Sequence, residues 1–114
     1  MTAGNISPNV TVEMLCGGEN SKAILNSNII AVLREIDNLG SLNAATKRLH
    51  MGYSNTLYAI CRVEDALGVK LTERVCPKGS KLTDEGRQLI ELFLNAQTSI
   101  QEYACDIVSE MRTA

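Results

Sequence analysis

The polar side chains with the most chemical potential in this chain lie within residues 40–86. Four of them fall at helical spacing, on one face of a predicted helix: Ser54, Asn55, Tyr58 and Arg62. An asparagine amide can form two hydrogen bonds with adenine, a serine hydroxyl can donate or accept, and arginine binds guanine or phosphate. This row of side chains therefore predicts contact with nucleic acid.

Two short helices joined by a tight turn are needed to present that row. Ser41 is a good N-cap for a helix that carries Leu49, and residues 50–52 break this helix. A second helix then begins at Ser54, its natural cap, and ends at Gly68. This layout is that of a helix-turn-helix, whose second helix enters the major groove of DNA.

The second helix has an apolar repeat opposite the polar row. Its expected inner face comprises Leu57, Ile60, Val63 or Glu64, and Leu67. His50, in the turn before this helix, is expected to be an ordinary hydrogen-bonded turn residue.

Further DNA contacts are expected from the first helix and from a small β-hairpin, the wing. Residues 69–75 and 81–82 form its predicted strands, with a turn at 76–80 between them. The expected contact residues outside the polar row are Ser41, Asn43, Lys47, Tyr53, Arg74, Lys78 and Lys81. Two alternatives stay open: Tyr53 packs between the helices, and Arg74 pairs with Glu73 or with a helix C-terminus.

The charge distribution supports this placement, although the whole chain carries a net charge of −2. Residues 43–82 hold seven basic and three acidic residues, a net charge of +4. The segments before and after carry −2 and −4. Because local charge steers association, the positive segment is the expected DNA surface.

The rest of the chain completes one domain over residues 1–114. Its expected fold class is mainly α with small β elements, a winged helix-turn-helix. Residues 1–8 are expected to be disordered, 9–25 to form a β-hairpin, 28–82 the helix-turn-helix and wing, and 83–112 a dimerisation helix. The apolar positions of that last helix follow an alternating spacing of three and four residues, interrupted at Gln97. The expected dimer contacts are Ile90, Phe93, Ile100, Ala104, Ile107 and Met111.

The remaining reactive side chains do not suggest catalysis. The four cysteines, Cys16, Cys61, Cys76 and Cys105, are far apart, and no zinc-binding or other metal-ligand spacing is present. We find no catalytic constellation and expect a non-enzyme without cofactor or metal. There is no signal peptide or membrane-spanning run, so we expect a cytoplasmic protein that does not contact membranes.

The winged helix-turn-helix resembles that of LysR-type regulators. The matching residues run without gaps from Gly40 to Arg74 and continue in the wing: Gly40, Ser41, Arg48, Leu49, His50, Glu64, Leu67, Gly68, Val69, Leu71, Glu73, Arg74, Leu82, Thr83 and Gly86. The N-terminal strand, Met51-Gly52-Tyr53 and Ala59-Ile60 are more similar to the DNA-binding domain of ModE, the molybdate-responsive repressor. These resemblances imply a DNA-binding regulator acting as a homodimer on double-stranded DNA.

Two features depart from the ModE pattern. Nothing follows the long helix in this sequence, and no residues match an oxyanion-binding motif, so we expect a stand-alone domain without a molybdate site. The wing also lacks an extended glycine-rich loop. Two other functions remain alternatives: a winged-helix module that binds proteins, and a redox-responsive regulator that uses Cys76, which lies beside Arg74 and Lys78.

Overall fold

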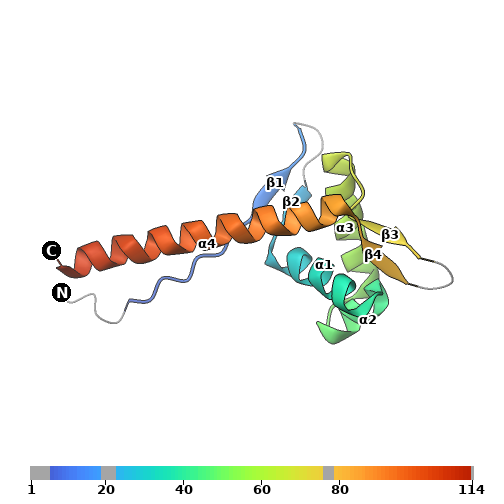
Figure 1. Ribbon diagram of the computed structural model, residues 1–114, viewed down its shortest axis with the longest axis horizontal. Coiled ribbons are helices and arrows are strands. Elements are labelled where there is room, and N and C mark those ends of the chain that lie inside the picture. The colour runs from blue at the N-terminus through green and yellow to red at the C-terminus, as the bar shows by residue number, and fades with distance from the viewer. Residues whose placement is uncertain (1–5, 19–22, 76–78, 114) are drawn as a thin grey trace.

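The computed structural model describes residues 6–18, 23–75 and 79–113. Two antiparallel strand pairs flank a helical domain, and a long final helix extends away from it (Figure 1). The elements are β1 (Met14–Cys16), β2 (Ala23–Leu25), α1 (Ser27–Leu39), α2 (Leu42–Arg48), α3 (Tyr53–Leu67), β3 (Thr72–Arg74), β4 (Ser80–Leu82) and α4 (Asp84–Thr113). The predicted fold class, mainly helical with small strand pairs, is confirmed.

The ends of α1 and α2 follow from their capping residues. The Asn26 side chain accepts a hydrogen bond from the Ile29 backbone N–H, which starts α1. Gly40 ends the helix in the left-handed region, at φ 74°. The Ser41 hydroxyl then accepts from the Ala44 N–H at 3.0 Å and starts α2. Each bond satisfies a backbone group that the helix itself leaves free.

The start of α3 differs from the prediction that Ser54 caps it. Gly52 is the N-cap, no side chain caps the helix, and α3 begins at Tyr53. Ser54 lies inside the first turn, where its exposed hydroxyl is not used as a cap.

The buried face of α3 is also turned relative to the prediction. Thr56, Ile60, Val63 and Glu64 are the buried residues of this helix. Leu57 and Leu67, predicted on the inner face, are each 39% exposed. The cause lies outside the helix: the buried Glu64 carboxylate accepts a hydrogen bond from the Leu71 backbone N–H at 2.8 Å. This bond fixes α3 to the segment that leads into the wing.

The turn between α2 and α3 is closed by a Schellman motif. The His50 N–H donates to the Lys47 carbonyl at 3.3 Å, and the Met51 N–H donates to the Thr46 carbonyl at 2.9 Å. His50 occupies the left-handed position of this motif, at φ 56°. Glycine is the residue best suited to that position because it has no Cβ to clash with the backbone.

His50→Gly is therefore expected to raise the free energy of unfolding by about 1 kcal/mol. The β-branched variant His50→Val is expected to lower it, because its side chain tolerates the left-handed region poorly. Urea denaturation of the three proteins measures both effects. A glycine variant less stable than the wild type would show that the His50 side chain contributes more than its backbone conformation costs.

The wing is anchored on the corner between α1 and α2. Strands β3 and β4 pair antiparallel, with Glu73 opposite Lys81. The Ser80 N–H donates to the Gly40 carbonyl at 2.9 Å. A Cβ at Gly79 would lie 2.8 Å from that same carbonyl oxygen, so a glycine is needed for this close approach.

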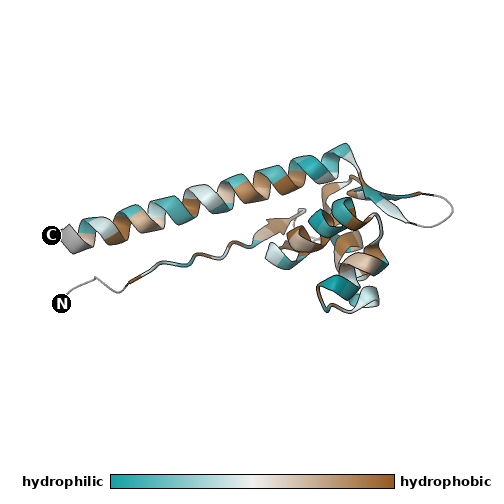
Figure 2. Ribbon diagram, turned by 60° about the horizontal axis from the view of Figure 1, so that its bottom comes forward, coloured by the Kyte–Doolittle hydropathy of each residue, from teal (hydrophilic) through white to brown (hydrophobic). Residues whose placement is uncertain are grey.

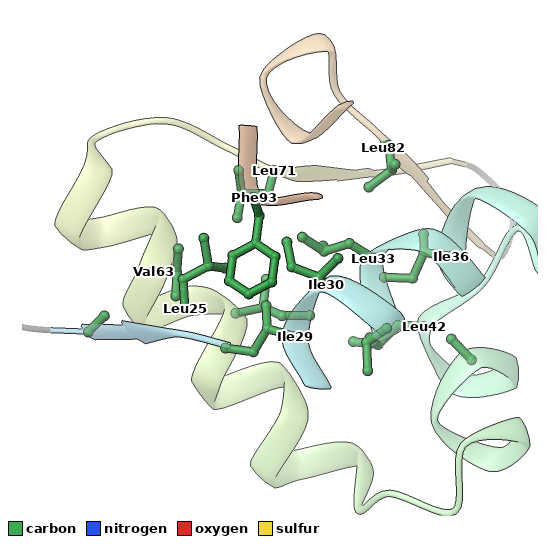
Figure 3. Close-up of a cluster of buried hydrophobic side chains, with 14 of the residues drawn as sticks. Leu25, Ile29, Ile30, Leu33, Ile36, Leu42, Val63, Leu71, Leu82 and Phe93 are labelled. Atoms are coloured by element: carbon green, nitrogen blue, oxygen red, sulfur yellow. The ribbon is translucent and has the colours of Figure 1, made fainter. Parts of the chain in front are cut away.

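The hydrophobic core gathers side chains from every part of the domain (Figure 3). Phe93 of α4 is fully buried, and its ring lies among Leu25 of β2, Ile30 of α1 and Val63 of α3. Leu71 and Leu82, both at the base of the wing, close the cluster from that side. The core thus joins the wing, the helix-turn-helix and the first half of α4 into one unit.

The N-terminal segment forms less sheet than predicted. Among the described residues of the predicted hairpin at 9–25, only β1 and β2 pair, with Leu15 opposite Ile24. Residues 6–13 run instead beside the outer part of α4 (Figure 1). Of the segment predicted to be disordered, residues 1–5 lie outside the described residues, and residues 6–8 belong to this extended run.

Candidate nucleic-acid interface

The outer face of α3 presents the predicted polar row. Ser54, Asn55, Tyr58 and Arg62 are all exposed, while the opposite face of the helix is buried in the core. Within the row, Arg62 and Tyr58 are partners: Arg62 Nη1 donates to the Tyr58 hydroxyl at 3.4 Å, and the guanidinium carbon lies 5.8 Å from the ring centroid. The Tyr58 ring thereby stabilises the Arg62 guanidinium at an exposed position.

A second group of predicted residues meets at an open hollow of about 550 Å³. It lies between the turn end of the wing, where Arg74 pairs with Ser80, the start of α2 and the start of α3. Among the residues that line it are Ser41, Asn43, Tyr53, Arg74 and Ser80. The Ser80–Gly40 hydrogen bond holds the wing here, and it thereby brings Arg74 close to the helix-turn-helix.

The cations around this hollow differ in what they pair with. Lys81 forms an ion pair with Glu73 at 3.3 Å, whereas no described residue pairs with Arg74. The alternative of an Arg74–Glu73 pair is therefore not what the structure has. Lys47 is exposed on α2. Lys78 lies outside the described residues, as does Cys76.

Tyr53 is 42% exposed and lines the hollow. Its ring is therefore partly buried and partly open to solvent. This position is compatible with both predicted roles, packing between the helices and contact with DNA. Ser41 is half-buried and its hydroxyl already accepts the α2 capping bond, so it has a structural role whatever else it contacts.

The structure adds residues that the sequence pattern did not single out. A second open hollow, of about 610 Å³, lies along α3 and is lined by Asn55, Tyr58 and Arg62 together with Ile24 and Asn28. Asn28 and, at the first hollow, Ser80 are polar neighbours of the predicted contacts. Only tertiary proximity identifies them, because neither belongs to the periodic pattern of α2 or α3.

The predicted dimer stripe of α4 divides into two parts. Phe93 was predicted as an interface residue, but it is 0% exposed within its own chain and cannot contact a partner. Ile90 is half-buried and packs against the same core. In the outer half of the helix, Ile100, Ile107 and Met111 are 43%, 40% and 67% exposed, and Ala104 is half-buried. Hydrophobic positions thus recur along α4 beyond the core (Figure 2).

The described cysteines differ in accessibility. Cys16 is buried and burial raises the pKa of its thiol, whereas Cys61 and Cys105 are exposed. At about pH 8, iodoacetamide is expected to modify Cys61 and Cys105 in the folded protein and Cys16 only after unfolding, because the thiolate is the reactive form. Peptide mass spectrometry of native and urea-treated samples measures this. Equal native labelling of Cys16 would contradict the burial of its side chain at the end of β1.

No group of three or more metal-ligating side chains comes together within the described ranges. Nor does any helix there have the length and apolar character needed to cross a membrane.

Comparison with known proteins identifies the fold. Residues 28–87, just over half of the chain, match the model of the bacterial regulatory helix-turn-helix proteins of the lysR family. The chain belongs to the lysR family. The matched region runs from the start of α1 to the start of α4 and contains the helix-turn-helix and the wing. The family is one of regulators, not of enzymes.

A solved structure supports the same assignment. The chain is similar to the protein in the crystal structure of the CbnR_DBD–DNA complex, with a TM-score of 0.53 and 26% sequence identity. The similarity covers 78% of this chain and 97% of that one. No curated protein was found to match. The lysR-family match confirms the first resemblance, while the region before residue 28, which carries part of the ModE resemblance, lies outside it.

Proposed function

We propose that this chain is a sequence-specific DNA-binding transcriptional regulator that acts as a homodimer. The observation that carries the proposal is the division of α3 into a buried face and an exposed row of Ser54, Asn55, Tyr58 and Arg62. A helix held this firmly by one face can place the other in the major groove. The similar CbnR_DBD was crystallised with DNA, which supports the same partner here.

In this arrangement the residues have distinct roles. Ser54 and Asn55, in the first turn of α3, contact base edges, and Asn55 is suited to bidentate bonds with adenine. Arg62, supported by Tyr58, reaches a phosphate or a guanine. Asn43, Lys47, Tyr53 and Arg74 position the protein on the backbone from both sides of α3.

The dimer is proposed from the outer half of α4. Ile100, Ala104, Ile107 and Met111 continue the three-four spacing beyond the domain core, and this spacing suits a second helix of the same pattern. Two copies would place two α3 helices about one DNA turn apart, roughly 34 Å, on a palindromic site.

A ModE-type N-terminal domain without a molybdate site is the finer assignment that we propose. It is supported by the β1–β2 hairpin before α1 and by the Met51-Gly52-Tyr53 sequence at the start of α3.

Selection of bound duplexes from random DNA, run at about 50 and about 200 mM salt, tests the function. The enriched sequences are expected to share a two-fold symmetric motif, and affinity is expected to fall steeply with salt because phosphate contacts release counterions. Added molybdate is expected to leave the motif unchanged. If no sequence is enriched and no complex forms at low salt, the DNA-binding proposal fails and a protein-binding module becomes the better account.

A further inference from the structure

Residues 6–13, here called the N-terminal arm, lie along the outer part of α4, which Figures 1 and 2 show from two directions. One side chain connects the two. The Val10 backbone N–H donates to Gln101 Oε1 at 2.8 Å, and Gln101 Nε2 donates to the Pro8 carbonyl. A single amide thus satisfies a donor and an acceptor of the extended arm, as a neighbouring strand would. Gln101 is separated from these residues by more than ninety positions in the sequence.

The arm borders the apolar strip of α4. Gln97, Gln101 and Val108 recur on one flank of the helix, and all three are half-buried. The adjoining strip, Ile100, Ala104, Ile107 and Met111, keeps three side chains that are 40% or more exposed. On the arm itself, Ile6 is 45% exposed and Val10 is half-buried. The arm and the strip therefore form one continuous, partly apolar surface at the end of the molecule away from the wing.

The positions of the charges around this surface are compatible with a second copy of this chain as the partner. Glu102, Asp106 and Glu110 recur at four-residue steps and lie on the far side of α4 from the flank that bears Gln101. Two copies that meet through the strip and the arm keep these like charges away from the contact. A strip with three-four spacing also matches best a helix with the same spacing, which the second copy supplies.

The amount of surface indicates why the arm is needed. Stable interfaces bury about 800 Å² on each partner. Ile100, Ile107 and Met111 are only 40–67% exposed and Ala104 is half-buried, so the strip alone supplies less than that. We infer that the N-terminal arm, held on α4 by Gln101, adds to the strip and completes the surface through which two copies of this chain meet. This inference rests on the proposed homodimer and makes Gln101 a positioning residue of its interface.

Sedimentation equilibrium of the full chain tests the inference without DNA. Gln101→Ala removes the hydrogen bonds that hold the arm on α4. Ile6→Asp leaves those hydrogen bonds in place but puts a charge on the arm surface. Both are expected to raise the dimer dissociation constant tenfold or more. Gln88→Ala, which removes an exposed amide from the inner half of α4, is the matched control and is expected to change it less than twofold. Thermal unfolding at a concentration where all variants are monomeric shows whether the domain itself stays folded.

The possible outcomes separate the inference from the function on which it rests. A wild-type chain that is monomeric at about 100 µM overturns both the homodimer and the inference. A wild-type dimer whose dissociation constant is unchanged in Gln101→Ala and Ile6→Asp overturns the inference alone. A change in Gln101→Ala without one in Ile6→Asp means that the arm only braces α4, and it also overturns the inference.

Discussion

Gly86→Ala is expected to destabilise the domain by about 3 kcal/mol or more, the upper range for overpacking. A Cβ at this position would lie 2.4 Å from the Leu71 carbonyl oxygen and 3.3 Å from Leu82 Cδ2. The first obstacle is backbone, which cannot rotate aside as a long side chain would. The backbone of α4 or of Leu71 must therefore move.

The surroundings of Gly86 make that movement costly. The Leu71 carbonyl already accepts the Thr83 N–H at 3.0 Å, and the Leu71 N–H donates to the buried Glu64 carboxylate. The Thr83 hydroxyl accepts the Gly86 N–H at 3.0 Å and donates to the Lys70 carbonyl. Moving the start of α4 away from Leu71 would break these bonds and shift Phe93 in the core.

Thermal unfolding followed by circular dichroism measures the effect. A loss of this size lowers the melting temperature of a small domain by roughly 12 °C or more. Gly18→Ala is the matched control, because nothing lies within 4 Å of a Cβ there. If Gly86→Ala melted within about 2 °C of the control, the close contact between α4 and the Leu71 backbone would be wrong.

Asn55→Ala is expected to weaken binding to the selected DNA site by about 30-fold or more. A bidentate contact to a base contributes about 1–3 kcal/mol, and a dimer loses it at both half-sites. Because Asn55 is exposed in the first turn of α3, its removal leaves the core intact. The loss is also expected to be sequence-dependent: the variant should discriminate less at one base pair of each half-site.

Fluorescence anisotropy with the selected site and with single-base variants measures both quantities. Asn95→Ala, which removes an exposed amide from α4, serves as the control and is expected to bind like the wild type. If Asn55→Ala lost affinity equally for every sequence, Asn55 would contact the phosphate backbone, and the assignment of base reading to it would be contradicted.

The parts of the fold set by local chemistry were predictable from the sequence. Asn26 and Ser41 cap their helices through bonds within three residues, and Gly40 and Gly68 end helices in the left-handed conformation. Such signals need no knowledge of the rest of the chain. The exposed row of α3 was predictable for a similar reason, because helical spacing alone places its four members on one face.

The parts set by distant partners were not predictable. Leu57 was predicted on the inner face of α3 because it is apolar, but it is 39% exposed. Glu64 was offered for that face as an alternative to Val63, and its burial depends on the hydrogen bond from the Leu71 backbone. Phe93 fits the dimer spacing of α4, but the domain core already covers it. Nothing near Gln101 in the sequence indicates that its amide holds Pro8 and Val10. The hollow at the wing likewise depends on a contact between Gly40 and Ser80.

Methylation protection tests most directly whether α3 occupies the major groove of DNA. Dimethyl sulfate methylates guanine N7, which faces the major groove. With the dimer bound to a selected site that has guanines in each half-site, we predict N7 protection in two segments about one helical turn apart on one face of the duplex. A bound complex in which guanine N7 remains fully reactive throughout the site would contradict the placement of α3 in the major groove.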